Sequence, residues 1–195
     1  MHFIEQTGKI DRKEISPNKR EQILSLICAT DDYSLLKDCD LIIEAVFEDE
    51  KLKSDIFKHF KNMIKDDAIL SSNTSSIPIS KLAKYSNHPK NFIGIHFFSP
   101  VHKMKLVEVI KTKETSSRTI SKIFDFITQI KKIPILVNDG PGFYTTRVFM
   151  RYVMEGMALL YDGYSSKPIE SIAKKAGFPV GPLTVLDEIG LKVAY

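Results

Sequence analysis

Short apolar runs alternate with amphipathic stretches over roughly the first two thirds of the chain. The runs are rich in β-branched residues and lack a polar face, which is typical of strands buried on both sides of a parallel sheet. They cover residues 41–46, 68–70, 92–97, 106–110 and 133–137. A further, weaker strand is predicted over residues 25–30.

Helical periodicity separates these runs. Apolar residues recur at helical spacing over residues 49–65 and 116–132, with charged residues on the opposite side, and a shorter helix is predicted over residues 80–85. Strands that alternate with helices indicate βαβ units. The pattern therefore predicts an α/β fold with a parallel sheet.

The pattern changes after Asn138. The breaker sequence Asp-Gly-Pro-Gly covers residues 139–142, and the chain beyond it reads as helices over residues 143–161, 166–176 and 183–189. We therefore expect a first domain over residues 1–138 and a second, all-helical one over residues 139–195. Because so short a helical segment rarely buries a core alone, it must pack on the first domain, on another chain or on an absent portion.

Polar residues follow several predicted strands, and in an open parallel sheet ligands bind at the carboxyl ends of the strands. Glu48 follows the first run, a serine-rich run over residues 71–76 follows the second, and His96 and Ser99 lie at the end of the third. Other interpretations stay open. The serine-rich run could cap the next helix, Glu48 could be a carboxylate at a helix N-terminus, and Lys53 could be plain surface.

His96 and Glu108 are the most informative pair. His96 lies in a very apolar stretch, where it could also be a core histidine bound to a backbone carbonyl. Glu108 lies within the next strand between valines, where an unpaired carboxylate is costly. If the two strands are neighbours, Glu108 can hold one imidazole nitrogen and leave the other free to take or give a proton. The other histidines lie in polar surroundings and read as surface residues: His2, His59, His88 and His102.

Composition excludes several classes of protein. The net charge of +4 comes mostly from dispersed lysines, with only five arginines among 28 basic residues, which indicates a solvated surface rather than a nucleic-acid interface. No apolar run approaches the roughly 20 residues of a membrane span, and the N-terminus lacks a secretory signal pattern. Cys28 and Cys39 lack metal-ligand spacing and read as reduced cytosolic thiols.

One glycine cluster is misleading. Gly140-Pro-Gly142 follows a predicted strand and precedes a helix, as a phosphate-binding loop does. The third glycine is missing, however, and Pro141 lacks the N–H that could reach a phosphate. No glycine occurs between Gly8 and Gly94. We therefore predict no dinucleotide phosphate loop in this sequence.

These motifs together resemble the 3-hydroxyacyl-CoA dehydrogenase family, and most closely the dehydrogenase part of multifunctional fatty-acid β-oxidation α subunits. The similarity runs from about residue 10 to the C-terminus. It is carried by motifs that follow one another in the family's order, namely residues 40–46, 72–76, 96–101, 104–110, 141–143, 177–182 and 186–190.

The resemblance implies a Rossmann-type NAD-binding domain and an all-helical, dimer-forming domain. It implies that the 3-hydroxyl of an acyl-CoA is oxidised to a ketone while hydride passes to NAD. His96 matches the family's catalytic base and Glu108 its orienting carboxylate. The remaining matched residues are Ser75, near both substrate and nicotinamide, and those expected to contact NAD: Ala45, Val46, Phe47, Glu48, Lys53 and Ser99.

The sequence also departs from the family pattern. It begins after the first strands and glycine-rich loop and stops partway through the helical domain, so we expect an incomplete Rossmann sheet and a partial helical domain. We expect full activity to need the missing strands from an upstream polypeptide; the alternative is a catalytically silent remnant or partner-binding domain. Thr146 stands where the family has a substrate-binding asparagine, and a hydroxyl offers fewer donors than an amide.

The resemblance also implies partners and a location. It implies an acyl-CoA substrate and an assembly that is a homodimer, a complex with other β-oxidation subunits or a complex with a missing N-terminal fragment. Together with the two reduced thiols, it leads us to expect a cytoplasmic protein.

Overall fold

The computed structural model describes residues 16–189 of the chain. The chain divides into two units, and the boundary between them falls after Lys37. The predictions for His2 and for Gly190, the last residue of the final motif, lie outside the described residues. The first unit contains helix α2 (Pro17–Leu24), whose N-cap Ser16 accepts a hydrogen bond from the Lys19 amide at 3.2 Å.

The strand predicted over residues 25–30 is wrong. These residues form a turn and irregular backbone, and Leu26 is 85% exposed. A strand needs a neighbour for its backbone hydrogen bonds, and no described strand pairs with this segment. A 3-10 helix η1 (Tyr33–Asp38) follows it.

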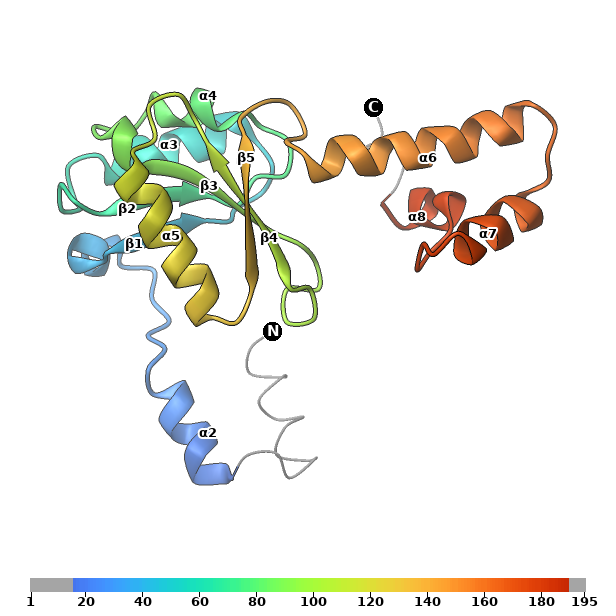
Figure 1. Ribbon diagram of the computed structural model, residues 1–195. Helices are drawn as coiled ribbons and strands as arrows, with labels where there is room; N and C mark the ends of the chain where they lie inside the picture. The colour runs from blue at the N-terminus through green and yellow to red at the C-terminus, as the bar shows by residue number, and fades with distance from the viewer. Residues whose placement is uncertain (1–15, 190–195) are drawn as a thin grey trace. The chain divides into compact units, whose positions relative to one another are not determined.

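The second unit contains a five-stranded sheet in the order β1-β2-β3-β4-β5 (Figure 1). The α/β fold class is therefore confirmed. The strands are β1 (Leu41–Glu44), β2 (Ile69–Ser72), β3 (Phe92–Phe97), β4 (Leu106–Lys111) and β5 (Ile133–Asn138).

The sheet is mostly parallel, but β3 and β4 are antiparallel, so the expected all-parallel sheet is wrong at this pair. Residues 98–105 connect the two strands, and a parallel crossover needs a dozen or more residues. Because β4 runs back along β3, the register places His96 directly opposite Glu108. The reversal therefore decides where the two residues meet.

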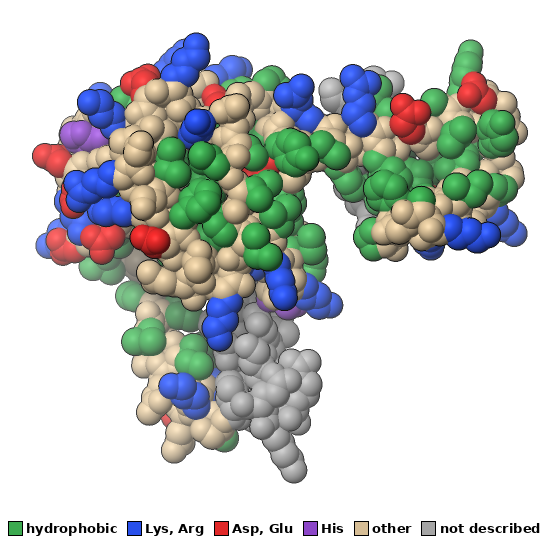
Figure 2. Space-filling view, in the orientation of Figure 1, with side chains coloured by type: hydrophobic (Ala, Val, Ile, Leu, Met, Phe, Trp, Pro, Cys, Tyr) green, Lys and Arg blue, Asp and Glu red, His purple; other side chains and the backbone are tan. Residues whose placement is uncertain are grey.

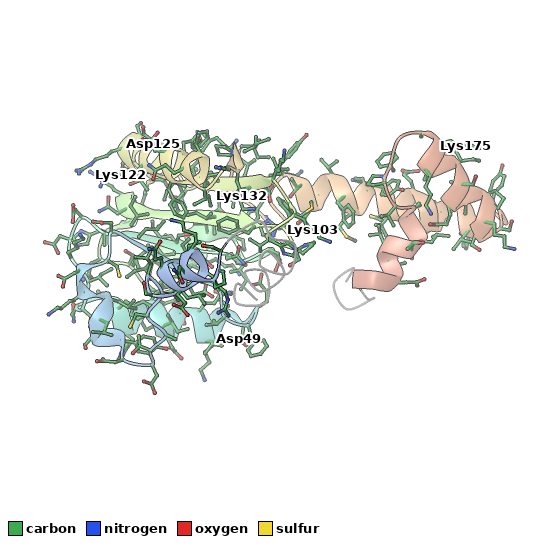
Figure 3. All side chains as sticks on the ribbon, turned by 90° about the horizontal axis from the view of Figure 1, so that it is seen from below. Asp49, Lys103, Lys122, Asp125, Lys132 and Lys175 are labelled. Atoms are coloured by element: carbon green, nitrogen blue, oxygen red, sulfur yellow. The ribbon has the colours of Figure 1, made fainter. Side chains whose placement is uncertain are left out.

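Helices cover both faces of the sheet, with α5 (Ser117–Gln129) on one face and α3 (Glu50–Phe60) and α4 (Ile79–Ala83) on the other (Figure 1). The short 3-10 helix η2 (Pro89–Asn91) leads into β3. At the start of α3, the Asp49 carboxylate accepts a hydrogen bond from the Leu52 amide at 2.7 Å, and Figure 3 labels Asp49 there. The helix is shorter than predicted, because residues 61–63 form a turn.

The two faces of the sheet differ in chemistry. The face under α5 is the apolar core, with Ile93, Ile95 and Val109 fully buried against Ile123 and Ile127 of the helix. The opposite face carries the polar side chains of Glu44, Ser72, His96 and Glu108. There a side chain at Gly94 would lie 2.7 Å from Ile79, so glycine allows α4 to approach the sheet closely.

Three helices form the C-terminal part: α6 (Thr145–Tyr161), α7 (Ser166–Lys175) and α8 (Pro182–Ile189). They pack on one another, and Glu170 of α7 accepts hydrogen bonds from the Leu183 and Thr184 amides at the start of α8. All three were predicted, although α6 starts two residues later than expected because a turn precedes it. Over the described residues, we find no helix long and apolar enough to cross a membrane.

Candidate functional site

His96 and Glu108 form a buried hydrogen-bonded pair on the polar face of the sheet. Nδ1 of His96 lies 2.8 Å from Oε2 of Glu108, and the two side chains are 9% and 0% exposed. Because an ionised carboxylate only accepts hydrogen bonds, we assign the proton to Nδ1. Nε2 then keeps its lone pair, and no residue of the described range hydrogen-bonds to it. The structure thus brings together two residues that the sequence placed on neighbouring strands.

The second oxygen of Glu108 is held by backbone amides at the start of α6. Oε1 accepts hydrogen bonds from the Tyr144 amide at 3.1 Å and from the Thr145 amide at 2.8 Å. Burial raises the pKa of Glu108, but the hydrogen bonds from His96 and the Thr145 amide outweigh it and hold the pKa below its ordinary value. Glu108 is therefore an anion at neutral pH.

Residues 139–145, which we call the strap, join β5 to α6 and pass beside this pair. The Asp139 carboxylate fastens the beginning of the strap. Oδ1 of Asp139 accepts a hydrogen bond from the Ile79 amide at 2.6 Å, and Oδ2 accepts one from the Ser80 amide at 2.9 Å. The strap is therefore tied to α4 at one end and to Glu108 at the other.

Aromatic rings enclose His96. The ring of Phe98 lies 4.6 Å from the imidazole between centroids, and that of Phe143, in the strap, lies 6.1 Å away. Phe143 is 3% exposed and has a positive φ of 46°, directly after Gly142 with a φ of 66°. A side chain other than glycine is uncommon in this conformation and persists only where the surroundings enforce it.

A second buried carboxylate, Glu44, lies at the end of β1 on the same face. Its Oε1 accepts hydrogen bonds from Lys53 Nζ and from the Val46 amide, both at 2.7 Å, and its Oε2 accepts one from the Ser72 hydroxyl at 2.6 Å. The Lys53 side chain is only 1% exposed, so the interpretation of Lys53 as plain surface is wrong. Its ammonium also contacts the Val46 carbonyl at 3.1 Å and Glu48 Oε2 at 3.4 Å.

Glu48 holds the turn that follows β2. Its Oε1 accepts hydrogen bonds from the Thr74 hydroxyl, from the Ser75 amide at 3.1 Å and from the Ser76 amide at 3.0 Å. Burial raises the pKa of Glu48, but hydrogen bonds from Thr74 and Ser76 and the charge of Lys53 outweigh it and hold the pKa below its ordinary value. Glu48 therefore binds hydroxyl and amide groups of a turn that lies 26 or more residues away along the chain, rather than the amides at the start of α3.

Five of the remaining predicted site residues follow the carboxyl ends of β1, β2 and β3, and their side chains are accessible. Phe47 is 87% exposed and Val46 39%, so two apolar side chains face solvent directly after the buried strand β1. Ala45, Ser75 and Ser99 are exposed as well. Thr146 is half-buried in the first turn of α6, one residue after the Thr145 amide that binds Glu108.

A lysine secures the loop that carries Phe98 and Ser99. Nζ of Lys132 donates to the carbonyls of Val101 at 2.5 Å and Met104 at 2.7 Å, and Figure 3 labels Lys132 near Lys103 of the same loop. This loop follows His96 directly. Over the range that the structure describes, no group of three or more histidine, cysteine or acidic residues could hold a metal ion.

Sequence reasoning missed Glu44, Asp139 and Lys132. Glu44 had a usable signal, because a carboxylate inside an apolar strand needs a partner just as Glu108 does. Asp139 was read only as part of a breaker sequence, and Lys132 only as a surface cation. Their partners lie 59 to 60 and 28 to 31 residues away, so no local pattern points to them.

Comparison with known families gives two matches that together cover nearly the whole chain. Residues 3–140 match the family model described as "3-hydroxyacyl-CoA dehydrogenase, NAD binding domain". Residues 142–195 match the model of the C-terminal domain of the same family.

Relatives and solved structures agree with these matches. A fatty acid oxidation complex subunit alpha from a Shewanella strain is 43% identical over 184 residues, which are 94% of this chain but 26% of the relative. The (S)-3-hydroxybutyryl-CoA dehydrogenase structure from Ralstonia eutropha is 34% identical with a TM-score of 0.93, over 96% of this chain and 67% of that one. A 3-hydroxybutyryl-CoA dehydrogenase structure from Escherichia coli is 29% identical with a TM-score of 0.93, over 99% and 41%.

Proposed function

Because the chain belongs to the 3-hydroxyacyl-CoA dehydrogenase family, we propose that it carries the catalytic pair of an NAD-dependent oxidoreductase. The reaction converts a 3-hydroxyacyl-CoA thioester to the 3-oxoacyl-CoA in fatty-acid β-oxidation. The chain spans 26% of the length of the curated relative, so this activity is a proposal for the chain itself. The observation that carries it is the 2.8 Å contact between His96 Nδ1 and Glu108 Oε2, with Nε2 left unbonded.

The rim formed by β1 and β2 fits a nicotinamide dinucleotide. Oε1 of Glu48 already accepts hydrogen bonds from the turn after β2. Oε2 contacts only Lys53, and the side chain is 37% exposed. Oε2 can therefore accept a further hydrogen bond from a ribose hydroxyl. Exposed Phe47 and Val46 offer an apolar surface to a ring. NAD bound here supplies the hydride acceptor. Lys53 and Glu44 fasten this rim from beneath.

His96 acts as the general base of the proposed reaction. Its Nε2 lone pair accepts the proton of the 3-hydroxyl as the hydride leaves C3, and the imidazole becomes an imidazolium. Glu108 stabilises this cation through Nδ1–H, and the two amides at the start of α6 keep the carboxylate charged. In the reverse direction, the imidazolium returns the proton to the ketone oxygen.

Ser75 and Thr146 are the hydroxyls that we assign to the substrate. Ser75 is exposed within the turn that Glu48 holds, and Thr146 lies in the first turn of α6. Ser99, in the loop after His96, completes the expected cofactor contacts. Each of these three side chains can donate one hydrogen bond to a carbonyl or amide.

We also propose how the chain is organised and assembled. Two separate family models meet between residues 140 and 142, which supports a division near residue 138. Figure 2 shows hydrophobic side chains at the surface of α6–α8, and Phe149, Met154 and Leu160 are each at least 40% exposed. Such a surface supports an assembly, either a homodimer or a complex with other β-oxidation subunits. The free thiols Cys28 and Cys39 support a cytoplasmic location.

Reduction of acetoacetyl-CoA by NADH tests the function. We expect the chain to oxidise NADH in the presence of this substrate, and His96→Gln to reduce the rate by about 10³-fold. His88→Gln is the matched control, because its ring is 45% exposed and only faces Asp66. An equal rate for His96→Gln and the parent chain would contradict the proposal. A folded parent chain with no rate at all would favour a catalytically silent domain.

A further inference from the structure

Asp139 is a carboxylate that the proposed chemistry does not use, although its contacts lead to the catalytic pair. Its carboxylate accepts hydrogen bonds from the amides of Ile79 and Ser80, the first two residues of α4, at 2.6 and 2.9 Å. Pro78 precedes that helix and provides no side-chain hydrogen bond to it. Asp139 therefore supplies from a distance of about 60 residues the acceptors that the start of α4 lacks in its own sequence.

The strap that begins at Asp139 has a conformation that needs to be held at both ends. Gly142 and Phe143 are both in the left-handed region, with φ of 66° and 46°. Phe143 has a Cβ, so its conformation costs energy that contacts elsewhere must offset. Its ring is 3% exposed and lies beside His96. The Asp139 contacts hold one end of the strap, and the amides of Tyr144 and Thr145 on Glu108 hold the other.

We propose that Asp139 is a positioning residue for the His96–Glu108 pair, acting through the strap. By anchoring the strap to α4, Asp139 keeps two amide donors on Glu108 and the ring of Phe143 against His96. Without the anchor, the strap relaxes toward an ordinary conformation and its amides leave the carboxylate. Glu108 then loses two of its three hydrogen bonds and orients the imidazole less well. The inference rests on the proposed function only for its effect on the rate.

The test compares Asp139→Ala with Asp162→Ala, an exposed aspartate just after α6. The first readout is the proton resonance of His96 Nδ1–H, identified by its absence in His96→Gln and measured without substrate or cofactor. We expect the resonance to broaden or disappear in Asp139→Ala and to persist in Asp162→Ala, with circular dichroism showing both variants folded. A resonance unchanged in folded Asp139→Ala would overturn the proposal.

The second readout is the steady-state reduction of acetoacetyl-CoA by NADH. We expect kcat to fall about 10- to 100-fold in Asp139→Ala with little change in KM for NADH, because the catalytic pair and not the cofactor rim is displaced. An unchanged kcat would contradict the inference, and so would a change in KM for NADH without a fall in kcat. If the parent chain has no rate, the proposed function fails, while the resonance still decides the positioning role.

Asp139→Asn provides a second variant in case Asp139→Ala does not fold. The asparagine keeps one acceptor oxygen for the Ile79 amide but presents an N–H to the Ser80 amide. We therefore expect a folded protein with an intermediate change in both readouts. A folded Asp139→Asn chain that matches the parent in both readouts would overturn the positioning role as well.

Discussion

Glu44 and Glu108 are two buried glutamates on the same face of one sheet, and each accepts three hydrogen bonds. Glu44 is 5% exposed and binds Lys53, the Val46 amide and the Ser72 hydroxyl. Glu108 is fully buried and binds His96 and the amides of Tyr144 and Thr145. Residue type, burial and hydrogen-bond number are therefore almost matched between the two sites.

The basic partner makes the difference. The three N–H groups of Lys53 face three protein acceptors, namely Glu44, the Val46 carbonyl and Glu48. This cation therefore joins α3 to the end of β1 and to Glu48, which holds the turn after β2. His96 uses one nitrogen for Glu108 and keeps a second that can carry a proton. Under the proposed function, Glu108 takes part in the reaction because its partner retains a nitrogen that can accept a proton, whereas the partner of Glu44 does not.

The same Glu-to-Gln substitution at the two sites separates their roles, and the largest effect is expected at Glu108. Glu108→Gln leaves His96 with a neutral partner that cannot stabilise an imidazolium, so kcat for acetoacetyl-CoA reduction should fall by about 10³-fold. The free energy of unfolding should change by only about 1 kcal/mol, because an amide oxygen can still accept the strap amides.

Steady-state rates and urea unfolding measure the two effects of Glu108→Gln. Glu155→Gln, at an exposed position on α6, is the control and should alter neither. If Glu108→Gln kept the parent rate, Glu108 would have no role in the reaction, and the proposed difference in function between Glu108 and Glu44 would be wrong.

Glu44→Gln should instead act on stability. It leaves the Lys53 ammonium buried with only Glu48, at 3.4 Å, as a charged partner. Removing one member of a buried ion pair costs about 3 kcal/mol, measured as a lower urea midpoint at an unchanged denaturant dependence. The matched control is Glu50→Gln, which breaks an exposed ion pair with Lys81 and should cost less than about 1 kcal/mol. Equal losses in the two variants would show that burial of the Glu44 pair is unimportant.

The pH dependence of stability gives the smallest effect. The pKa values of Glu48 and Glu108 lie below the ordinary value in the folded chain, so the unfolded chain binds protons first on acidification. Their contribution to stability is complete above the ordinary glutamate pKa of about 4.3 and is lost as pH falls through the folded values. Each carboxylate adds at most about 1.4 kcal/mol per pH unit to the slope.

Urea unfolding between about pH 6 and about pH 3 measures this slope. Glu48→Gln and Glu108→Gln should each flatten it, whereas Glu155→Gln should leave it as in the parent chain. This experiment compares the two sites by how protonation of Glu48 and of Glu108 changes the free energy of unfolding, rather than by reaction rates. A slope that none of the substitutions alters would mean that other carboxylates carry the acid sensitivity.

Much of the fold was readable from local pattern. The observed bounds of each strand of the sheet agree with the predicted ones to within two residues. A short apolar run rich in β-branched residues is the local pattern of a strand buried on both faces. His96 and Glu108 were identifiable as candidates for the same reason, since a polar group among apolar neighbours implies a partner. The strand predicted over residues 25–30 shows the limit, because an apolar pattern without a neighbouring strand forms no sheet.

Tertiary structure decided which residues far apart in the sequence contact one another. The antiparallel course of β4, set by the short connection after β3, places Glu108 opposite His96. The Glu44–Lys53 pair, the hold of Glu48 on the turn after β2 and the anchor of Asp139 on α4 join residues 9 to 60 positions apart. The amino-acid sequence by itself indicated the five strands of the sheet, the main helices and the polar groups of His96 and Glu108 among apolar residues, because these follow from nearest neighbours along the chain. Which polar group meets which depended on strand register and chain reversal, and these exist only once the sheet has formed.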